Sequence, residues 1–259
     1  MTNKPQYDTI QRPYDYVRGA SIAFIERENV QEKVKPFIKN ARILELACGT
    51  GFYTYSFLDW GASSVLGVDV SSAMLNEARR QGKQVSFIQA DCSIPQIYDG
   101  GNFDIVFAAW LLNYAPGRAG LVDMFRNVTM NLRDGGRFVA ITCPPSSNPI
   151  ESLNAEVSAR PMPAGSGYLI YKHIEDVEDG IYFQVHGETP LGELDFYNYH
   201  LKREIYEQAA REAGLQIREW DFTKVPEKYL KGEGPGGASL MELEIYQTIP
   251  NYGVLVISK

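Results

Sequence analysis

From Ala41 onward, short β-rich runs of hydrophobic residues alternate with stretches that have helical spacing. The β-like runs include RILEL, SVLGVDV, VSFIQA, FDIVFAA and RFVAIT, and the helical stretches include FYTYSFLDW, SSAMLNEARR and residues 118–131. Strands and helices that alternate in this way form right-handed βαβ units on a parallel sheet with helices on both faces. The pattern therefore predicts an α/β fold whose ligands bind at the carboxyl ends of the strands.

The pattern changes after Thr142. CPPSSNP and RPMPAGSG indicate loops around a short helix, and residues 168–199 contain several β-like runs separated by turn signals. KREIYEQAAREAG predicts an amphipathic helix ending at Gly214, and LQIREWDF and NYGVLVIS predict two late strands. We expect a single domain over residues 1–259, with a helical cap at 1–40 and an antiparallel, substrate-side insertion at 143–200.

The segment RILELACGTGF places Gly49 and Gly51 between a β-run and the start of a helix. Glycine lets the backbone approach a ligand closely, and a strand, a tight turn and a helix N-terminus together form a nucleotide-type site. The dinucleotide fingerprint needs a third glycine where this chain has Thr54, which disfavours NAD. A strand-to-helix turn without a ligand is the alternative explanation of the two glycines alone.

Carboxylates close the next two predicted strands. Asp69 ends SVLGVD, where it can accept both hydroxyl hydrogens of a ribose, and Asp91 ends VSFIQAD beside Cys92, an arrangement suited to an adenine edge. Each carboxylate could instead be a helix cap or a turn residue. Taken together with Glu45 and the glycine turn, the three successive strand ends predict an adenosyl-binding site.

The segments ELACGTG, GVDVS, QADC, FDIVFAAWLLNY and LRDGGRFVAI resemble the successive motifs of class I S-adenosylmethionine-dependent methyltransferases. Within that superfamily, ACGTGFYT, LLNYA and FYNYHLKREIYEQAAREAGL resemble the toxoflavin-synthase-like group of small-molecule methyltransferases. The resemblance implies a Rossmann-like, seven-stranded, mostly parallel sheet with helices on both faces. It also implies S-adenosylmethionine as cofactor and a small-molecule substrate of secondary metabolism.

The resemblance implies a set of cofactor contacts that follows the strand ends. Gly49 and Gly51 would lie against the methionine part of the cofactor, with Glu45 supporting the loop or reaching the cofactor amine. Asp69 would hold the ribose, Val70 and Met74 would pack on adenine, and Asp91 and the Cys92 backbone would bind the adenine edge. Ala108 and Ala109 would lie near the sulfonium. Met74 could equally be a core side chain.

Three further regions supply candidates on the substrate side. Tyr14 and Arg18 belong to an aromatic N-terminal segment that could fold over the cofactor, since a sulfonium favours aromatic faces, or could simply pack on the sheet. Trp110 and Asn113 follow the fourth strand beside the expected methyl group and are candidate substrate contacts. The candidate catalytic residues are His200 and Tyr114. Many members of the superfamily have His at the position of Tyr114. We expect His200, or Tyr199 beside it, to act as a base or to bind the substrate.

Charge and cysteine spacing narrow the classes of partner. Lys and Arg total 25 against 32 Asp and Glu, for a formal net charge of -7, which opposes broad contact with nucleic acid or anionic lipid. The cysteines are too far apart in sequence to form the close pairs of disulfide scaffolds and zinc knuckles: Cys48, Cys92 and Cys143. We expect a cytoplasmic protein without a metal ion, as a monomer or homodimer that binds no membrane.

Together these patterns predict an enzyme that moves a methyl group to nitrogen or oxygen of a small, aromatic or heterocyclic metabolite by in-line displacement. Such an enzyme acts mainly by positioning, and it needs a proton acceptor only when the attacking atom arrives protonated. Two alternatives are a protein that binds S-adenosylmethionine without transferase activity and a nicotinamide-dependent dehydrogenase. The acidic charge argues against methylation of RNA or DNA.

Overall fold

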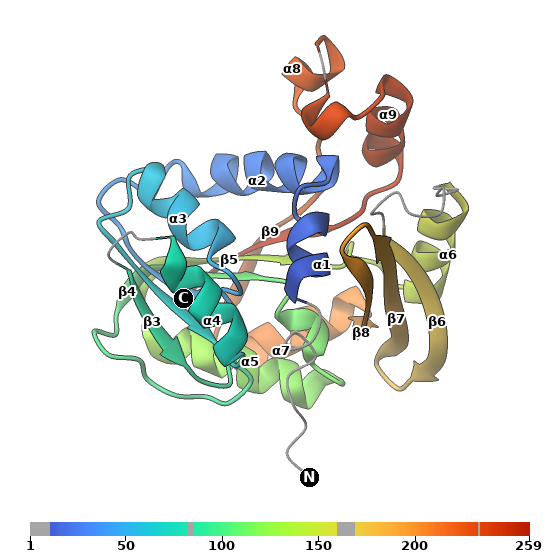
Figure 1. Ribbon diagram of the computed structural model, residues 1–259. Helices are drawn as coiled ribbons and strands as arrows, with labels where there is room; N and C mark the ends of the chain where they lie inside the picture. The colour runs from blue at the N-terminus through green and yellow to red at the C-terminus, as the bar shows by residue number, and fades with distance from the viewer. Residues whose placement is uncertain (1–10, 82–84, 160–168, 233) are drawn as a thin grey trace.

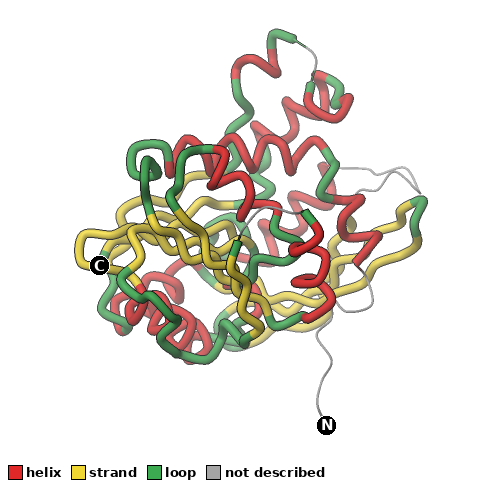
Figure 2. The backbone as a smooth tube through the Cα atoms, turned by 60° about the vertical axis from the view of Figure 1, so that its left-hand side comes forward, coloured by secondary structure: helices red, strands yellow, loops and turns green. Residues whose placement is uncertain are grey.

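The computed structural model describes residues 11–81, 85–159, 169–232 and 234–259, and its centre is a seven-stranded sheet (Figures 1 and 2). The strand order is β3-β2-β1-β4-β5-β10-β9. β1 to β5 run parallel to one another, whereas β10 is antiparallel to both β5 and β9. The strands are β1 Arg42–Leu46, β2 Ser64–Asp69, β3 Ser86–Gln89, β4 Phe103–Ala109, β5 Leu132–Thr142, β9 Gln216–Phe222 and β10 Gly253–Ser258. The predicted Rossmann-like, mostly parallel fold is confirmed.

Helices cover both faces of this sheet. α2 (Ser21–Val34) and α3 (Phe52–Asp59) pack on one face, and α5 (Arg118–Asn131) and α7 (Arg203–Glu212) pack on the other. Successive strand side chains point to opposite faces of the sheet. Ile43 therefore joins the core under α2 and α3, while Leu44 and Leu46 join the core under α5 and α7. This double burial explains why the strands have nearly continuous hydrophobic runs.

The segment after β5 forms a separate three-stranded antiparallel sheet, as expected from its sequence. It contains β6 (Leu169–Val177), β7 (Gly180–Thr189) and β8 (Gly192–Leu201), and α6 (Pro149–Ala159) precedes it. Figure 1 shows α1 (Gln11–Val17) between this sheet and the central one. Val17 packs into the same apolar cluster as Phe183 and Phe196, so the N-terminal helix and the insertion share a core.

A helical segment between β9 and β10 has no counterpart in the sequence predictions. It contains α8 (Glu227–Leu230), the short 3-10 turn η3 (Pro235–Gly237) and α9 (Leu240–Thr248), and it projects from the body in Figure 1. Leu243 and Tyr246 of α9 pack with Ile25 of α2, which anchors the segment to the helical cap. In the part of the chain that the structure describes, no helix is both long and apolar enough to cross a membrane.

Candidate active site

The turn between β1 and α3 uses two glycines for different reasons. Gly49 and Gly51 both have a left-handed backbone, with φ of 54° and 85°. A Cβ atom on Gly51 would lie 3.0 Å from the Tyr55 ring, whereas a Cβ atom on Gly49 would meet none of the residues that the structure describes within 4 Å. Gly51 therefore meets a packing need of the protein, and Gly49 leaves open space against which a ligand can lie.

Asp69 ties this turn to the end of β2. The Gly49 amide donates to Asp69 Oδ2 at 2.8 Å, and the Ser71 amide donates to Oδ1, also at 2.8 Å. α4 (Ser72–Arg80) is capped by the Ser71 hydroxyl, which accepts from the Met74 amide at 3.2 Å, so Asp69 is not the cap. A carboxylate at the end of a strand, beside a glycine turn, is the type of acceptor that binds ribose hydroxyls.

Glu45 lies under the same turn and is buried, with 2% of its surface exposed. The Thr54 hydroxyl donates a hydrogen bond to Glu45 Oε2. Burial is the main cause that raises the pKa of Glu45 to about 8, so this carboxyl group is largely protonated at neutral pH. Thr54, which breaks the dinucleotide glycine pattern, thus holds the buried acid at the centre of the turn.

The residues predicted to surround adenine occupy different environments. Val70 is 44% exposed, so its side chain is accessible to a ring, but Met74 is 2% exposed and belongs to the protein core. Asp91 Oδ1 accepts from the amide and the hydroxyl of Ser93, at 2.9 and 2.6 Å. The buried Cys92 accepts at its carbonyl from Asn127 Nδ2 at 3.0 Å, which fixes this strand end.

The end of β4 holds an unusual backbone. Ala108 is fully buried and Ala109 partly, and Trp110 follows with a φ of 63°, a conformation that costs a non-glycine residue about 1–2 kcal/mol. The Trp110 amide donates to the Ile141 carbonyl at 2.8 Å, and its indole Nε1 donates to Glu26 Oε2 at 2.9 Å. Backbone strain in a residue whose amide and side chain are both held by hydrogen bonds is a feature of ligand sites.

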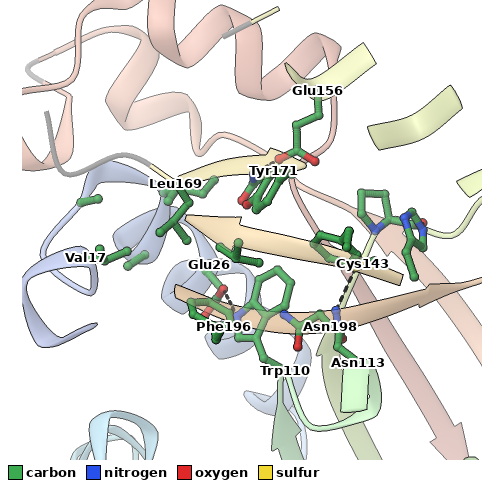
Figure 3. Close-up of a pocket in the computed structure, with 18 of the residues that line it drawn as sticks. Val17, Glu26, Trp110, Asn113, Cys143, Glu156, Leu169, Tyr171, Phe196 and Asn198 are labelled. Atoms are coloured by element: carbon green, nitrogen blue, oxygen red, sulfur yellow. Dashed lines mark hydrogen bonds between the residues drawn. The ribbon is translucent and has the colours of Figure 1, made fainter. Parts of the chain in front are cut away.

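A cavity opens beside Trp110 at the carboxyl ends of β4 and β5 (Figure 3). The N-terminal helices, α6 and the β6–β8 sheet enclose it, and its walls are mostly apolar and aromatic. Five of the predicted site residues meet there: Tyr14, Arg18, Trp110, Asn113 and His200. Tyr14 also makes an edge contact with Phe196, with ring centroids 6.4 Å apart.

Glu26 of α2 organises the cap side of this cavity, and no pattern in the sequence predicts this role. Its buried carboxylate accepts from Tyr53 Oη at 2.7 Å and from Trp110 Nε1, and it pairs with Arg18 Nη1 at 3.1 Å. The Arg18 guanidinium also lies over the Phe52 ring, 4.3 Å from its centroid. Arg18 is therefore neutralised by Glu26 and links the N-terminal segment to the start of α3.

Asn113 is held rigidly on the strand side of the cavity. It belongs to the 3-10 turn η2 (Leu112–Tyr114) and is fully buried. Its Nδ2 donates to Cys143 Sγ at 2.8 Å and its Oδ1 accepts from Thr142 Oγ1 at 2.7 Å. Burial raises the pKa of the Cys143 thiol, so this group stays protonated.

The candidate proton acceptors are less favourable than the sequence suggested. His200 is buried, its Nε2 donates to the Pro144 carbonyl at 2.8 Å, and burial lowers its pKa to about 4. It is neutral at pH 7 but binds a proton weakly. Tyr199 and Tyr114 do not line the described cavity. Tyr199 points to the other face of β8, because neighbouring strand residues alternate, and its ring lies 4.9 Å from that of Tyr182. Tyr114 packs against the core on the α5 and α7 side.

A known domain model matches the part of the chain that contains the glycine turn and the acidic strand ends. The cavity lies beside this part. Residues 43–136 match the model of a methyltransferase domain. The match covers β1 to the start of β5, and so includes every strand end at which the sequence predicts a cofactor contact.

Curated relatives carry methyltransferase names. Trans-aconitate 2-methyltransferase of Azoarcus sp. (strain BH72) is 29% identical over 159 residues, which are 55% of this chain and 60% of that protein. A tRNA U34 carboxymethyltransferase of Shewanella loihica is 29% identical over 119 residues, 44% of this chain and 35% of that protein. The chain thus spans less than two thirds of the relatives it matches.

Solved structures cover almost the whole chain. A putative S-adenosylmethionine-dependent methyltransferase from Listeria monocytogenes has a TM-score of 0.61 at 20% identity, over 90% of this chain and 96% of that one. CalS10, an amino pentose methyltransferase from Micromonospora echinaspora solved with S-adenosylmethionine bound, has a TM-score of 0.56 at 19% identity, over 96% of both chains. At these identities the likeness shows the fold.

The residues that sequence reasoning missed are buried polar side chains around the cavity: Glu26, Glu156 and Asn198. Asn198 could have been found, because strand alternation places it on the same face of β8 as His200. Glu26 and Glu156 lie on helices whose sequences show nothing that distinguishes a cavity-facing acid from a solvent-exposed one. Only the packing of the insertion against the helical cap reveals them.

Proposed function

We propose that the chain is an S-adenosylmethionine-dependent methyltransferase that acts on nitrogen or oxygen of a small aromatic or heterocyclic metabolite. The observation that carries this proposal is the pairing of two spaces across the end of β4. An open glycine turn, bonded to Asp69, lies on one side, and an apolar cavity lies on the other. Transfer between two bound molecules requires such adjoining sites.

The described residues fit the cofactor. The open space at Gly49 accepts a ligand without a clash with the described residues, and Asp69 at the end of β2 is an acceptor of the kind that binds ribose hydroxyls. When bound, S-adenosylmethionine supplies a methyl group on a positively charged sulfur. Glu45, being largely protonated, supports the turn through Thr54 rather than presenting a charge to the ligand. Val70 offers an accessible apolar surface for adenine.

Catalysis here rests on positioning and on exclusion of water. Trp110 is fixed by Glu26 at the boundary between the two spaces, and Asn113 is fixed by Thr142 and Cys143. His200, with its pKa near 4, serves as a substrate anchor and not as a base, so we expect an attacking atom that arrives with a free lone pair and needs no base.

The aromatic walls favour a flat, largely apolar substrate. Tyr171, Phe183 and Phe196 of the insertion line the cavity, which supports the role of residues 143–200 as the substrate-side element. The relatives named for trans-aconitate and for tRNA have negatively charged substrates. The net charge of -7 disfavours binding of either substrate to this chain, because like charges repel. The finer resemblance to the toxoflavin-synthase-like group agrees with this substrate class.

The test is calorimetry of the purified chain with S-adenosylmethionine and NAD side by side, followed by a screen for S-adenosylhomocysteine release with small aromatic amines and alcohols. We expect binding of S-adenosylmethionine only, and turnover with at least one acceptor. Binding without turnover on any acceptor of these classes would favour a non-enzymatic role, and binding of NAD alone would favour a dehydrogenase.

A further inference from the structure

Asn198 of β8 brings an unpaired acceptor to the cavity. It is 4% exposed and lines the cavity, and among the described residues its Oδ1 has no hydrogen-bond partner. Figure 3 shows it among the lining residues, together with Trp110 and Asn113. Phe183 is its register partner on β7, so an aromatic ring lies beside it on the same face. A buried carbonyl oxygen without a donor destabilises a protein, and in a ligand cavity it indicates that the ligand supplies the donor.

His200 adds a second acceptor to the same strand. Its Nε2 lies 2.8 Å from the carbonyl oxygen of Pro144, which can only accept, so Nε2 carries a proton. Burial lowers the pKa of His200 to about 4, so the ring is neutral at pH 7 and Nδ1 keeps a lone pair. His200 lines the cavity, and none of the residues that the structure describes donates a hydrogen bond to this Nδ1.

The two acceptors belong to one wall of the cavity. Asn198 and His200 are two residues apart on β8, and side chains on a strand alternate between faces, so both point to the same face. A strand rises about 3.3 Å per residue, which puts their Cα atoms roughly 6.6 Å apart. Two donors on adjacent positions of a ring point away from each other, so each can form a nearly straight hydrogen bond to its own acceptor at such a spacing.

We propose that the substrate presents two neighbouring hydrogen-bond donors, N–H or O–H, to Asn198 Oδ1 and His200 Nδ1, and that this pair of acceptors selects the substrate. This inference rests on the proposed function and names the substrate class that its second site takes: a flat ring with amino or hydroxyl groups on adjacent positions. An analogue without these donors leaves both acceptors unpaired, and a site built to bind a donor rejects such an analogue strongly. The proposal concerns recognition, and neither residue takes up a proton in it.

The experiment compares uncharged ring probes of similar size that carry two, one or no donor groups. 1,2-Dihydroxybenzene and 1,2-diaminobenzene carry two, 2-fluorophenol carries one, and 1,2-difluorobenzene carries none. Binding is measured by calorimetry at pH 7 with the protein saturated with S-adenosylhomocysteine. We expect a gain in affinity of about tenfold for each donor group. Equal affinity for 1,2-difluorobenzene and both two-donor probes, or no binding of either two-donor probe up to about 10 mM, would overturn the proposal.

Asn198→Leu removes the first acceptor and keeps a side chain of similar size. We expect it to weaken both two-donor probes about tenfold and to leave the binding of 1,2-difluorobenzene and of S-adenosylhomocysteine unchanged. Tyr197→Phe is the matched control, because it removes a hydroxyl group from the neighbouring residue on the opposite face of β8, and it should keep the preference of the parent. An unchanged preference in Asn198→Leu would refute the assignment.

His200→Gln provides a second variant in case Asn198→Leu does not fold. The amide nitrogen of glutamine reaches the position of Nε2 and can donate to Pro144, but no acceptor remains at the position of Nδ1. We expect it to weaken the two-donor probes about tenfold, and an equal weakening of 1,2-difluorobenzene would contradict an acceptor role. Failure of the parent to bind S-adenosylhomocysteine would count against the proposed function itself, whereas intact cofactor binding without a preference for donors would count only against this inference.

Discussion

The buried ion pair between Glu26 and Arg18 allows a prediction with a magnitude. Glu26→Gln keeps the shape of the side chain and one acceptor oxygen, but removes the negative charge. The Arg18 guanidinium then stays in the cap, with 15% of its side chain exposed, without an anion. Breaking one partner of a buried pair costs about 3–5 kcal/mol. Solvent access to Arg18 lowers the expected loss to about 3 kcal/mol.

For a chain of this size, about 3 kcal/mol corresponds to a fall in melting temperature of roughly 6–12 °C. The assay is thermal unfolding monitored by circular dichroism, with urea unfolding to obtain the free energy. Glu32→Gln removes an exposed carboxylate from the same helix and is expected to change the melting temperature by less than about 2 °C.

A double-mutant cycle separates the pair from the rest of the network. If the loss arises from the unpaired guanidinium, adding Arg18→Met to Glu26→Gln restores about half or more of the lost stability. The reasoning is refuted if Glu26→Gln and Glu32→Gln are equally stable, or if Arg18→Met and Glu26→Gln are strictly additive.

The remaining predictions concern the glycine turn, two buried titrating groups and the thiols. Gly51→Ala should cost about 1–2 kcal/mol for its left-handed backbone and more for its ring contact, whereas Gly49→Ala should cost only the backbone part yet weaken cofactor binding in calorimetry. Glu45 has a pKa raised from 4.5 to about 8, so the native state binds more protons than the unfolded state between these pH values, and its stability falls as pH rises through this range. Urea unfolding at pH 6 and at pH 7.5 should therefore show a decrease in the free energy of unfolding that is about 1–2 kcal/mol larger in the parent than in Glu45→Gln. His200 has a pKa lowered from 6.5 to about 4, so between these pH values the native state binds fewer protons than the unfolded state, and stability is lost as pH falls from 6.5 to 4. His200→Gln should reduce this dependence of the free energy of unfolding on pH. The same dependence in parent and variant would contradict the burial of His200 as a neutral ring. Burial raises the pKa of all three cysteine thiols, so the native protein should not react with a disulfide reagent at pH 8 until urea is added, and rapid reaction of the folded protein would be the contrary result.

Much of the central sheet could be predicted because its strands are buried on both faces and separated by strong turn signals. The glycine turn could be located for the same reason, since Gly49 and Gly51 follow a hydrophobic run directly. The helices between β9 and β10 could not, because α9 has hydrophobic residues on several sides and is anchored by contacts with α2 that are distant in sequence.

The candidate site shows the same division. Strand ends are local features, so the sequence was enough to place Asp69 at the end of β2, beside the glycine turn, and Trp110 at the end of β4. Side chains that depend on how the insertion meets the cap were missed or misplaced. Tyr199 was considered beside its neighbour His200, but strand alternation sends the two to opposite faces. Met74 matched a cofactor contact by resemblance, although burial places it in the core.

The central claim is that the ends of β1, β2 and β3 hold the adenosyl part of a methyl donor. It is tested most directly by calorimetric titration of S-adenosylhomocysteine into the parent chain and into Asp69→Asn, which keeps one acceptor oxygen but loses the charge. Charge-assisted hydrogen bonds contribute about 1.5–3 kcal/mol each, so we expect a loss of affinity of roughly 10-fold to 100-fold. Equal affinity of parent and variant, or no binding by the parent, would contradict the account.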